Sequence, residues 1–200
     1  MGNEATTIGR VTRCSTRGFI GAARAPEPEI PYFGAFCKAD AQQGKSAVIG
    51  LIYDISIEDD QLTRQMAAAE RPNDEELADQ RFVRQVPIEY SALAVGFWSE
   101  EKFNYALPPQ PPLALALIHA LQDDEIRAFT ERLDFIPIIL SADNLANDEL
   151  LAAAIQTAAS VRSAAERGAF LVDAGRYCAR LLANDLTRLE NVIRRFCDEK

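Results

Sequence analysis

The chain is poor in the residues from which most catalytic and metal sites are built. Its 200 residues include a single histidine, His119, and four cysteines that form no C-x-x-C pair. A zinc site would need ligands from distant parts of the sequence, and a Ser–His or Cys–His pair would depend on His119 alone. That histidine lies in an apolar stretch, 115–121, without another titratable group, so we interpret it as structural. We expect the four cysteines to be reduced and mostly buried: Cys14, Cys37, Cys178 and Cys197.

Long apolar runs and an excess of positive charge are also missing. No run of 18 apolar residues occurs, and residues 1–7 show neither the basic nor the apolar region of a signal peptide. We therefore predict a cytoplasmic protein that does not enter a membrane. Lysine and arginine number 21 against 30 aspartate and glutamate residues, a net charge of −9. Both halves share the acidic excess, so we expect no nucleic-acid partner.

Proline, in contrast, is concentrated at one place. Four prolines occur within the segment 107–112, Leu-Pro-Pro-Gln-Pro-Pro. Because proline lacks an amide hydrogen and fixes φ, this segment is expected to run extended and to continue neither a strand nor a helix. Residues before it are β-rich, and residues after it place alanine and leucine at helical spacing. We therefore predict a barrel over 5–107, a proline-rich strap and connector over 108–122, and a helical domain over 123–200.

The first part has the pattern of a small antiparallel β-barrel. Short strands are separated by glycine-marked turns, with no helix between consecutive strands, which is typical of a barrel. The charged segment 59–80 interrupts this pattern and carries apolar residues at helical spacing, so we interpret it as a helical or mobile insertion. The expected strands lie near 8–13, 19–20, 32–39, 46–57, 89–98 and 103–107, and the last of them closes the barrel.

One segment of this barrel resembles a phosphate-binding loop. Residues 39–46, Ala-Asp-Ala-Gln-Gln-Gly-Lys-Ser, match the Walker A pattern except for alanine at the first glycine. In such a loop Gly44 would wrap the phosphates, Lys45 would neutralise them and Ser46 would hold Mg²⁺. That geometry requires a helix after the loop, whose N-terminus binds the phosphates. The following residues are β-branched and apolar, so we favour a β-hairpin turn at Gln43–Gly44 without a nucleotide.

The second part is predicted to be mainly helical. An acidic first turn at Asp123–Asp124 opens a helix, and a second helix begins at Asn147 or Asp148 and ends at Gly168. The apolar stretch 135–140 must be buried, and its pattern fits either an extended or a helical segment. A long final helix runs from Ala169 toward Phe196 and packs on the second as a helical hairpin. The fold class is therefore α+β, a small antiparallel barrel followed by a mainly α-helical region.

Several charged and small residues of the second part have a structural and a functional interpretation. Arg194 and Arg195 end the final helix, where they compensate its dipole or form a small anion-binding patch. We favour dipole compensation. The alanines at 152–154 and 158–159 are small enough to admit a partner chain against the hairpin.

The barrel resembles the HAS-barrel family, named for the N-terminal barrels of HerA-type DNA translocases and of ATP synthase head subunits. The resemblance covers roughly residues 5–112 and rests on the order and spacing of four segments. In the larger members this barrel precedes an ATPase domain and helps to assemble an oligomeric ring. Here the strap leads into helices instead, so the resemblance implies a stand-alone, non-catalytic member. The four segments are 8–11 (Ile-Gly-Arg-Val), 32–36 (Tyr-Phe-Gly-Ala-Phe), 48–52 (Val-Ile-Gly-Leu-Ile) and 94–112.

These observations favour an interaction or assembly protein over an enzyme. No nucleophile–base pair or metal cluster is evident, and paired carboxylates such as Asp59–Asp60 and Asp123–Asp124 fall in charged turns where solvation is the usual state. We expect a protein partner, a HerA-like ATPase by the resemblance, or a homo-oligomer, and no cofactor. The alternative is a nucleotide-binding regulator that uses the Gly44-Lys45-Ser46 turn.

Overall fold

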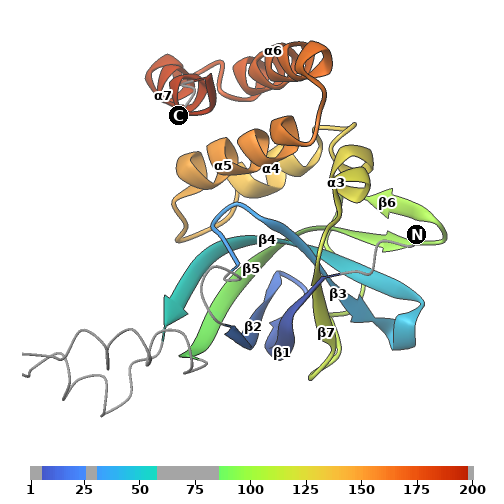
Figure 1. Ribbon diagram of the computed structural model, residues 1–200. Helices are drawn as coiled ribbons and strands as arrows, with labels where there is room; N and C mark the ends of the chain where they lie inside the picture. Colours follow the sequence, from blue (N-terminus) through green and yellow to red (C-terminus); the bar gives the residue numbers. More distant parts are fainter. Residues whose placement is uncertain (1–5, 26–30, 58–85, 198–200) are drawn as a thin grey trace, which may run out of the picture.

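The computed structural model describes residues 6–25, 31–57 and 86–197, and six strands of this part close into an antiparallel β-barrel (Figure 1). Around the barrel the strands follow in the order β2, β1, β7, β3, β4 and β5, and β5 pairs back with β2. Their bounds are β1 Thr7–Ser15, β2 Gly18–Ala25, β3 Phe36–Ala41, β4 Ser46–Ile57, β5 Val86–Ser99 and β7 Leu117–Ala120.

The barrel interior is filled by apolar side chains, so it is a packed core and not a pore. The first seven residues of β4, Ser46 to Ile52, are all buried. They are buried on both faces because Val48 and Ile52 point into the barrel, whereas Ile49 and Leu51 lie beneath the helices. This double burial explains why β4 is written as a continuous apolar run and not as an alternating one.

Glycine allows β2 to approach the barrel interior closely. A Cβ added to Gly21 would lie 2.5 Å from both Ile118 Cδ1 and Tyr90 Cζ. The Tyr90 hydroxyl donates a hydrogen bond to the Ile8 carbonyl at 3.1 Å, and burial raises the pKa of Tyr90. The tyrosine therefore remains a neutral donor that fills the interior and bonds to β1.

The proline-rich segment returns the chain to the barrel. The Leu113 amide donates to the Asp40 carbonyl at 3.0 Å, and β7 then enters between β1 and β3, with His119 opposite both Thr7 and Lys38. The connector predicted over 108–122 thus contains the sixth barrel strand. The sequence did not reveal β7 because four residues are too few to establish an alternating pattern.

The strand predicted to close the barrel near 103–107 has a different place. Residues Lys102–Asn104 form β6, which pairs with β5 through Phe97 opposite Asn104 and stands at the end of the strand order. It extends one side of the sheet beyond the barrel, and closure is made by β7 between β1 and β3 and by the pairing of β2 with β5.

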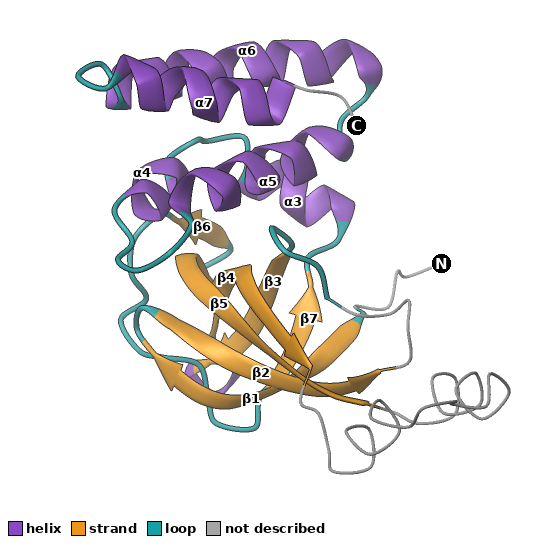
Figure 2. Ribbon diagram, turned by 90° about the vertical axis from the view of Figure 1, so that its left-hand side faces the viewer, coloured by secondary structure: helices purple, strands orange, loops and turns teal. Residues whose placement is uncertain are grey.

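Within the described residues, five helices follow the barrel and lie in two layers above it (Figures 1 and 2). α3, α4 and α5 cover the barrel, and α6 and α7 form an antiparallel hairpin on top of them. The predicted fold class, an α+β barrel followed by a helical region, is confirmed. The helix bounds are α3 Asp123–Phe129, α4 Phe135–Leu140, α5 Asn147–Ser160, α6 Ala164–Leu181 and α7 Leu186–Cys197.

The ends of these helices differ from the predicted ones. α5 ends at Ser160, and Gly168, the predicted stop, lies inside α6. α6 begins at a capping box, in which Ser163 accepts from the Glu166 amide and Glu166 accepts from the Ser163 amide. The long final helix is divided into α6 and α7, because the Asp185 carboxylate accepts from the Arg188 amide at 3.0 Å and starts a new helix.

The barrel and the helices share one apolar core. The stretch 135–140 is helical as α4, and Pro137 is tolerated because it lies in the first turn, where amides have no helical acceptor. Phe36 of the barrel contacts Phe129 and Phe135 edge-on, with ring centroids 5.8 and 5.9 Å apart. The helical region therefore packs directly on the barrel.

Two further sequence predictions concern the insertion over 59–80 and the absence of a membrane-spanning helix. The insertion predicted over 59–80 lies outside the described residues. Among the residues that are described, no helix has the length and apolar character to cross a membrane.

Candidate functional site

The Walker-like segment forms the predicted β-hairpin. β3 ends at Ala41, which pairs with Ser46 at the start of β4, and the residues between them turn through Gln42, Gln43 and Gly44 with φ of 51°, 57° and 81°. The residues after Lys45 continue as a strand. A phosphate at this turn would not meet the helix N-terminus on which Walker binding depends.

A pocket beside this turn is acidic. It has a volume of about 390 Å³ and lies between the β3–β4 hairpin and α3. Lys38 lines this pocket and is the side chain there that could bind a phosphate, but it forms an ion pair with Glu125. The carboxylates of Asp40 and Asp124 also line the pocket, with Trp98 as an aromatic wall. Three carboxylates against one lysine repel a polyphosphate, so the geometry does not favour the nucleotide-binding alternative.

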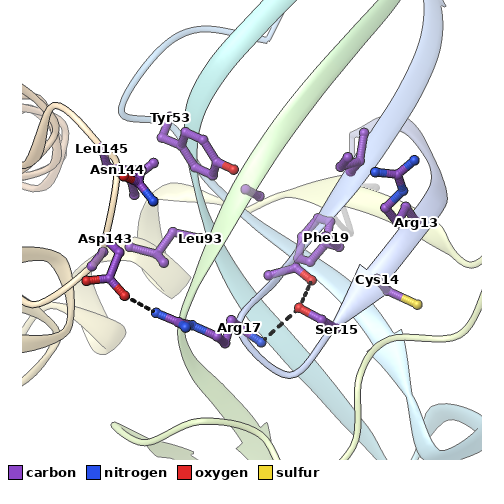
Figure 3. A pocket seen from close by; sticks show the side chains of 14 residues that line it. Arg13, Cys14, Ser15, Arg17, Phe19, Tyr53, Leu93, Asp143, Asn144 and Leu145 are labelled. Carbon is purple, nitrogen blue, oxygen red and sulfur yellow. Dashed lines mark hydrogen bonds and ion pairs between the residues drawn. The ribbon is translucent and has the colours of Figure 1, made fainter.

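A second pocket, of about 400 Å³, lies where the β1–β2 turn meets the loop between α4 and α5 (Figure 3). Arg17 reaches across it to Asp143, with 3.0 Å between Nη2 and Oδ2, and the Arg17 amide donates to Ser15 Oγ. Tyr53 of β4 and Cys14 of β1 also line this pocket. The Arg17–Asp143 ion pair therefore joins the barrel to the helical region at this pocket.

His119 and the cysteines occupy structural positions. His119 lies in β7, with Nδ1 3.2 Å from Thr7 Oγ1. Cys37 and Cys178 are buried, and burial raises both thiol pKa values, that of Cys178 to about 11. Cys14 is partly buried and Cys197 is exposed. All four are free, and the described residues contain no group of three potential metal ligands.

The charged pairs singled out in the sequence are separated in the structure. Asp123 and Asp124 stand exposed in the first turn of α3, at the positive end of its dipole. Asp59 and Asp60 lie outside the described residues. Arg194 and Arg195 occupy the last turn of α7, and Arg195 forms an ion pair with Glu149 of α5 at 2.7 Å. The Asp123–Asp124 and Arg194–Arg195 pairs thus lie on different helices, α3 and α7, and form no joint cluster.

The turn that follows the prolines presents apolar side chains to solvent. Leu113 is 44 % exposed and Leu115 is 69 % exposed. The turn is closed by a bond from the Ala116 amide to the Leu113 carbonyl. The turn is tied to β1 by three hydrogen bonds: the Leu115 amide donates to the Val11 carbonyl, the Val11 amide donates to the Ala116 carbonyl, and Arg10 donates to the Leu115 carbonyl. We call residues 113–116 the strap turn.

Leu115 has an unusual backbone conformation within the strap turn. Its φ is +63°, in the left-handed region that glycine and asparagine favour. Holding a leucine there costs on the order of 1 kcal/mol or more. Leu115 was not among the residues predicted to be functional, and its signal in the sequence is the Leu-Ala-Leu that follows the prolines.

The helix α7 has a second exposed apolar surface. Leu186, Leu189 and Ile193 line an open groove on it together with Glu190 and Arg194. The alanines of α5 that were predicted to admit a partner do not form such a surface. Ala152, Ala154, Ala158 and Ala159 are buried against the rest of the chain.

Comparison with known proteins adds no assignment, because no protein-family model and no curated protein matches the chain. The resemblance to HAS barrels therefore stays a prediction that rests on the sequence segments given above.

Proposed function

We propose that this chain is a non-catalytic interaction protein that assembles with a protein partner through its barrel. The observation that carries this proposal is the strap turn. Leu113 and Leu115 are exposed on a turn that four hydrogen bonds hold against β1 and the β3–β4 hairpin. A rigid apolar projection loses little conformational freedom on binding, and this favours its use as a contact.

The partner class comes from the sequence resemblance. The segments that resemble HAS barrels imply a HerA-like ATPase, and a closed antiparallel barrel is the architecture which that resemblance leads one to expect. The described pockets supply further support for a non-catalytic role. In the pocket of Figure 3 Asp143 forms an ion pair with Arg17, and in the acidic pocket Lys38 forms one with Glu125.

The experiment is affinity purification of the tagged chain from its native host with Mg-ATP present, followed by mass spectrometry. We expect an ATPase to be recovered in stoichiometric amount. Leu115→Gly should abolish its recovery, because the substitution removes the exposed side chain. Glycine also accepts the positive φ, so the variant should be at least as resistant to heat as the parent chain.

The matched control is made at Leu181 on α6, which is also exposed but lies in the outer helical layer. Leu181→Gly repeats the same substitution there, and Leu181→Ala removes the side chain without adding a glycine to the helix. Leu181→Ala should leave partner recovery unchanged. Recovery of the chain without any ATPase would contradict the proposed partner class. An ATPase that is retained by Leu115→Gly would show that the strap turn is not the contact.

A further inference from the structure

The helix α7 is held to the molecule by one side only. It lies at the edge of the outer helical layer, beside α6 and above α5 (Figures 1 and 2). Val192 and Phe196 are buried on its inner side, and Arg188 forms an ion pair with Asp148 of α5 at 2.8 Å. The orientation of α7 is therefore fixed, and so is the set of side chains that it turns outward.

The outward side of α7 combines an apolar groove with two opposite charges. Leu186 is 70 % exposed, and Leu189 and Ile193 are half-buried beside it. Glu190 and Arg194 line the same groove one helical turn apart, which places both charges on the same flank of the apolar residues. Arg194 donates to Asn191 Oδ1, and within the described part of the chain Glu190 forms no ion pair.

We propose that this groove binds α7 of a second copy of the chain, antiparallel and across a twofold axis. The inference goes beyond the proposed function, because this self-association surface is distinct from the strap turn. In a twofold antiparallel pair, the same flank of each helix faces its symmetry mate with the direction reversed. A flank that carries one acid and one base a turn apart is complementary to itself in that arrangement.

The charge pairing and the apolar packing agree on one register. If Glu190 lies opposite Arg194 of the second copy, the twofold axis passes level with residue 192. Ile193 of the second copy then lies level with residue 191, between Leu189 and Ile193 of the first. Leu189 and Ile193 of the two copies interleave along the groove while both Glu–Arg pairs form, and Leu186 lies at the edge of the contact. A parallel pair would place Glu190 against its own copy and is disfavoured.

The size of the surface predicts a weak dimer. The contact is limited to a helix of 12 residues. Stable interfaces bury about 1,200–2,000 Å², and one helix pair falls at the lower end of that range or below it. We therefore expect the dimer to form at micromolar concentrations and to dissociate on dilution.

The first test is sedimentation velocity of the full chain over a concentration series from about 1 µM to about 500 µM. The parent chain should pass from monomer to dimer over this range. Ile193→Glu and Glu190→Arg should each remain monomeric, the first because it places a carboxylate at the centre of the contact and the second because it places arginine opposite arginine. The double variant Glu190→Arg with Arg194→Glu should dimerise again, because the exchanged charges pair in the same register.

Two variants on α6 serve as controls. Val172→Glu places a carboxylate at another exposed apolar residue, 52 % exposed, and Arg167→Glu reverses an exposed charge. Both should dimerise like the parent chain. A chain that is monomeric at every concentration, or a Glu190→Arg variant that still dimerises, would overturn the proposal.

A cross-link tests the register itself. The register that pairs Glu190 with Arg194 also places Thr187 opposite Cys197 of the second copy, on the same flank of the helix. Thr187→Cys should therefore form a covalent dimer under mild oxidation, and Thr187→Cys with Cys197→Ser should not form this cross-link. A dimer without this cross-link would contradict the antiparallel register.

The outcomes separate this inference from the proposed function. Leu115→Gly leaves the α7 groove intact and should dimerise normally. An ATPase partner recovered by a strictly monomeric chain would leave the proposed function in place and remove the α7 dimer. A chain that dimerises but recovers no ATPase would support the α7 dimer and contradict the proposed function.

Discussion

At the scale of single residues, Arg162 connects three helices. Its guanidinium donates to the Thr130 carbonyl at 3.1 Å, to Thr130 Oγ1 at 3.0 Å and to the carbonyl of Ala158. The same group lies 3.8 Å from the centre of the Phe170 ring. Burial is the largest cause that lowers its pKa, yet an arginine remains charged at neutral pH. The residue thus satisfies carbonyls at the ends of α3 and α5 while it packs on α6.

Arg162→Lys should destabilise the fold although it keeps the charge. A lysine cannot present several donors in a plane or stack on Phe170 in the same way. We expect the free energy of unfolding to fall by about 1–3 kcal/mol, in line with the loss of hydrogen bonds from a charged group. Urea denaturation measures this change. Arg167→Lys, at an exposed position, should stay within about 0.5 kcal/mol of the parent chain, and an equal loss in both variants would contradict the role of Arg162.

Glu166 introduces a pH dependence at the start of α6. Its carboxylate accepts hydrogen bonds from the Ser163 hydroxyl and amide, and Arg127 lies 3.1 Å away. These contacts hold the pKa of Glu166 below its ordinary value of 4.5. Because the folded pKa is the lower one, this stabilisation is complete above the unfolded value and disappears as the pH falls through the folded value.

Glu166→Gln should therefore be less stable than the parent chain at neutral pH, with a difference that narrows on acidification. Thermal unfolding midpoints measured from about pH 7 to about pH 3 would follow the difference. Glu101→Gln, an exposed change in the β5–β6 turn, should show no comparable narrowing. A gap between Glu166→Gln and the parent that stays constant below the ordinary pKa of glutamate would rule out the carboxylate as its source.

At the scale of elements, the kind of each segment was predictable but several boundaries were not. The alternating and apolar runs of β1, β3, β4 and β5 revealed those strands, and the hairpin at 42–45 followed from the β-branched residues after it. Gly168 misled because glycine is frequent just after helices. The stronger signal was Ser163 followed by Glu166, a capping box that starts a helix and places Gly168 inside it.

The element that completes the barrel could not be identified from local sequence. β7 pairs with β1 and β3, whose residues lie about 80 to 110 positions earlier, as with Lys38 and Thr7 opposite His119. Its existence depends on the closure of the barrel and not on a pattern in its own four residues. The same reason explains why residues 103–107 were assigned the closing role that β7 has.

A contact between the barrel and α5 tests how tightly the elements are fitted. Gly34 has a φ of +82°, and a Cβ added there would lie 2.4 Å from Ala153 Cβ. Gly34→Ala should lower the free energy of unfolding by about 1–3 kcal/mol or more, because the added methyl is both strained and overlapped.

The double variant Gly34→Ala with Ala153→Gly gives the sharper measurement. Removing the Ala153 methyl relieves the closest overlap, although the strained φ and the backbone of residue 153 at 3.1 Å remain. We therefore expect the double variant to be more stable than the sum of the two single changes implies. Additive effects in urea denaturation would mean that the two residues do not touch.

At the scale of the whole molecule, the fold determines which apolar side chains stay exposed, because the chain buries most of its apolar faces against itself. The alanines of α5 appear in the sequence as candidates for a partner, and Ala152, Ala154, Ala158 and Ala159 are buried in the shared core. Leu115 and Leu186 look like ordinary core residues in the sequence and are left outside by the fold. The candidate contacts therefore required the structure, whereas the non-catalytic expectation required only the scarcity of histidine and of paired nucleophiles.

The shared core also predicts that barrel and helices unfold together. Trp98, the single tryptophan, lies in β5 of the barrel, whereas α3 to α7 supply the helical signal in far-ultraviolet circular dichroism. Phe129 is fully buried between them, with ring contacts to Phe36 and Phe135. Tryptophan fluorescence and circular dichroism should therefore report one transition at the same urea concentration.

Phe129→Ala makes this prediction decisive. Removal of a buried phenylalanine from the joint core should lower the free energy of unfolding by about 3–5 kcal/mol. If the core is common to both parts, the fluorescence and circular dichroism transitions of the variant move together to lower urea. A variant whose helical signal is lost while Trp98 keeps its parent transition would mean that the barrel is stable without the helices. The strap turn, which is bonded to the barrel alone, would then present its leucines independently of α7, and the two proposed contacts would belong to separately folding parts.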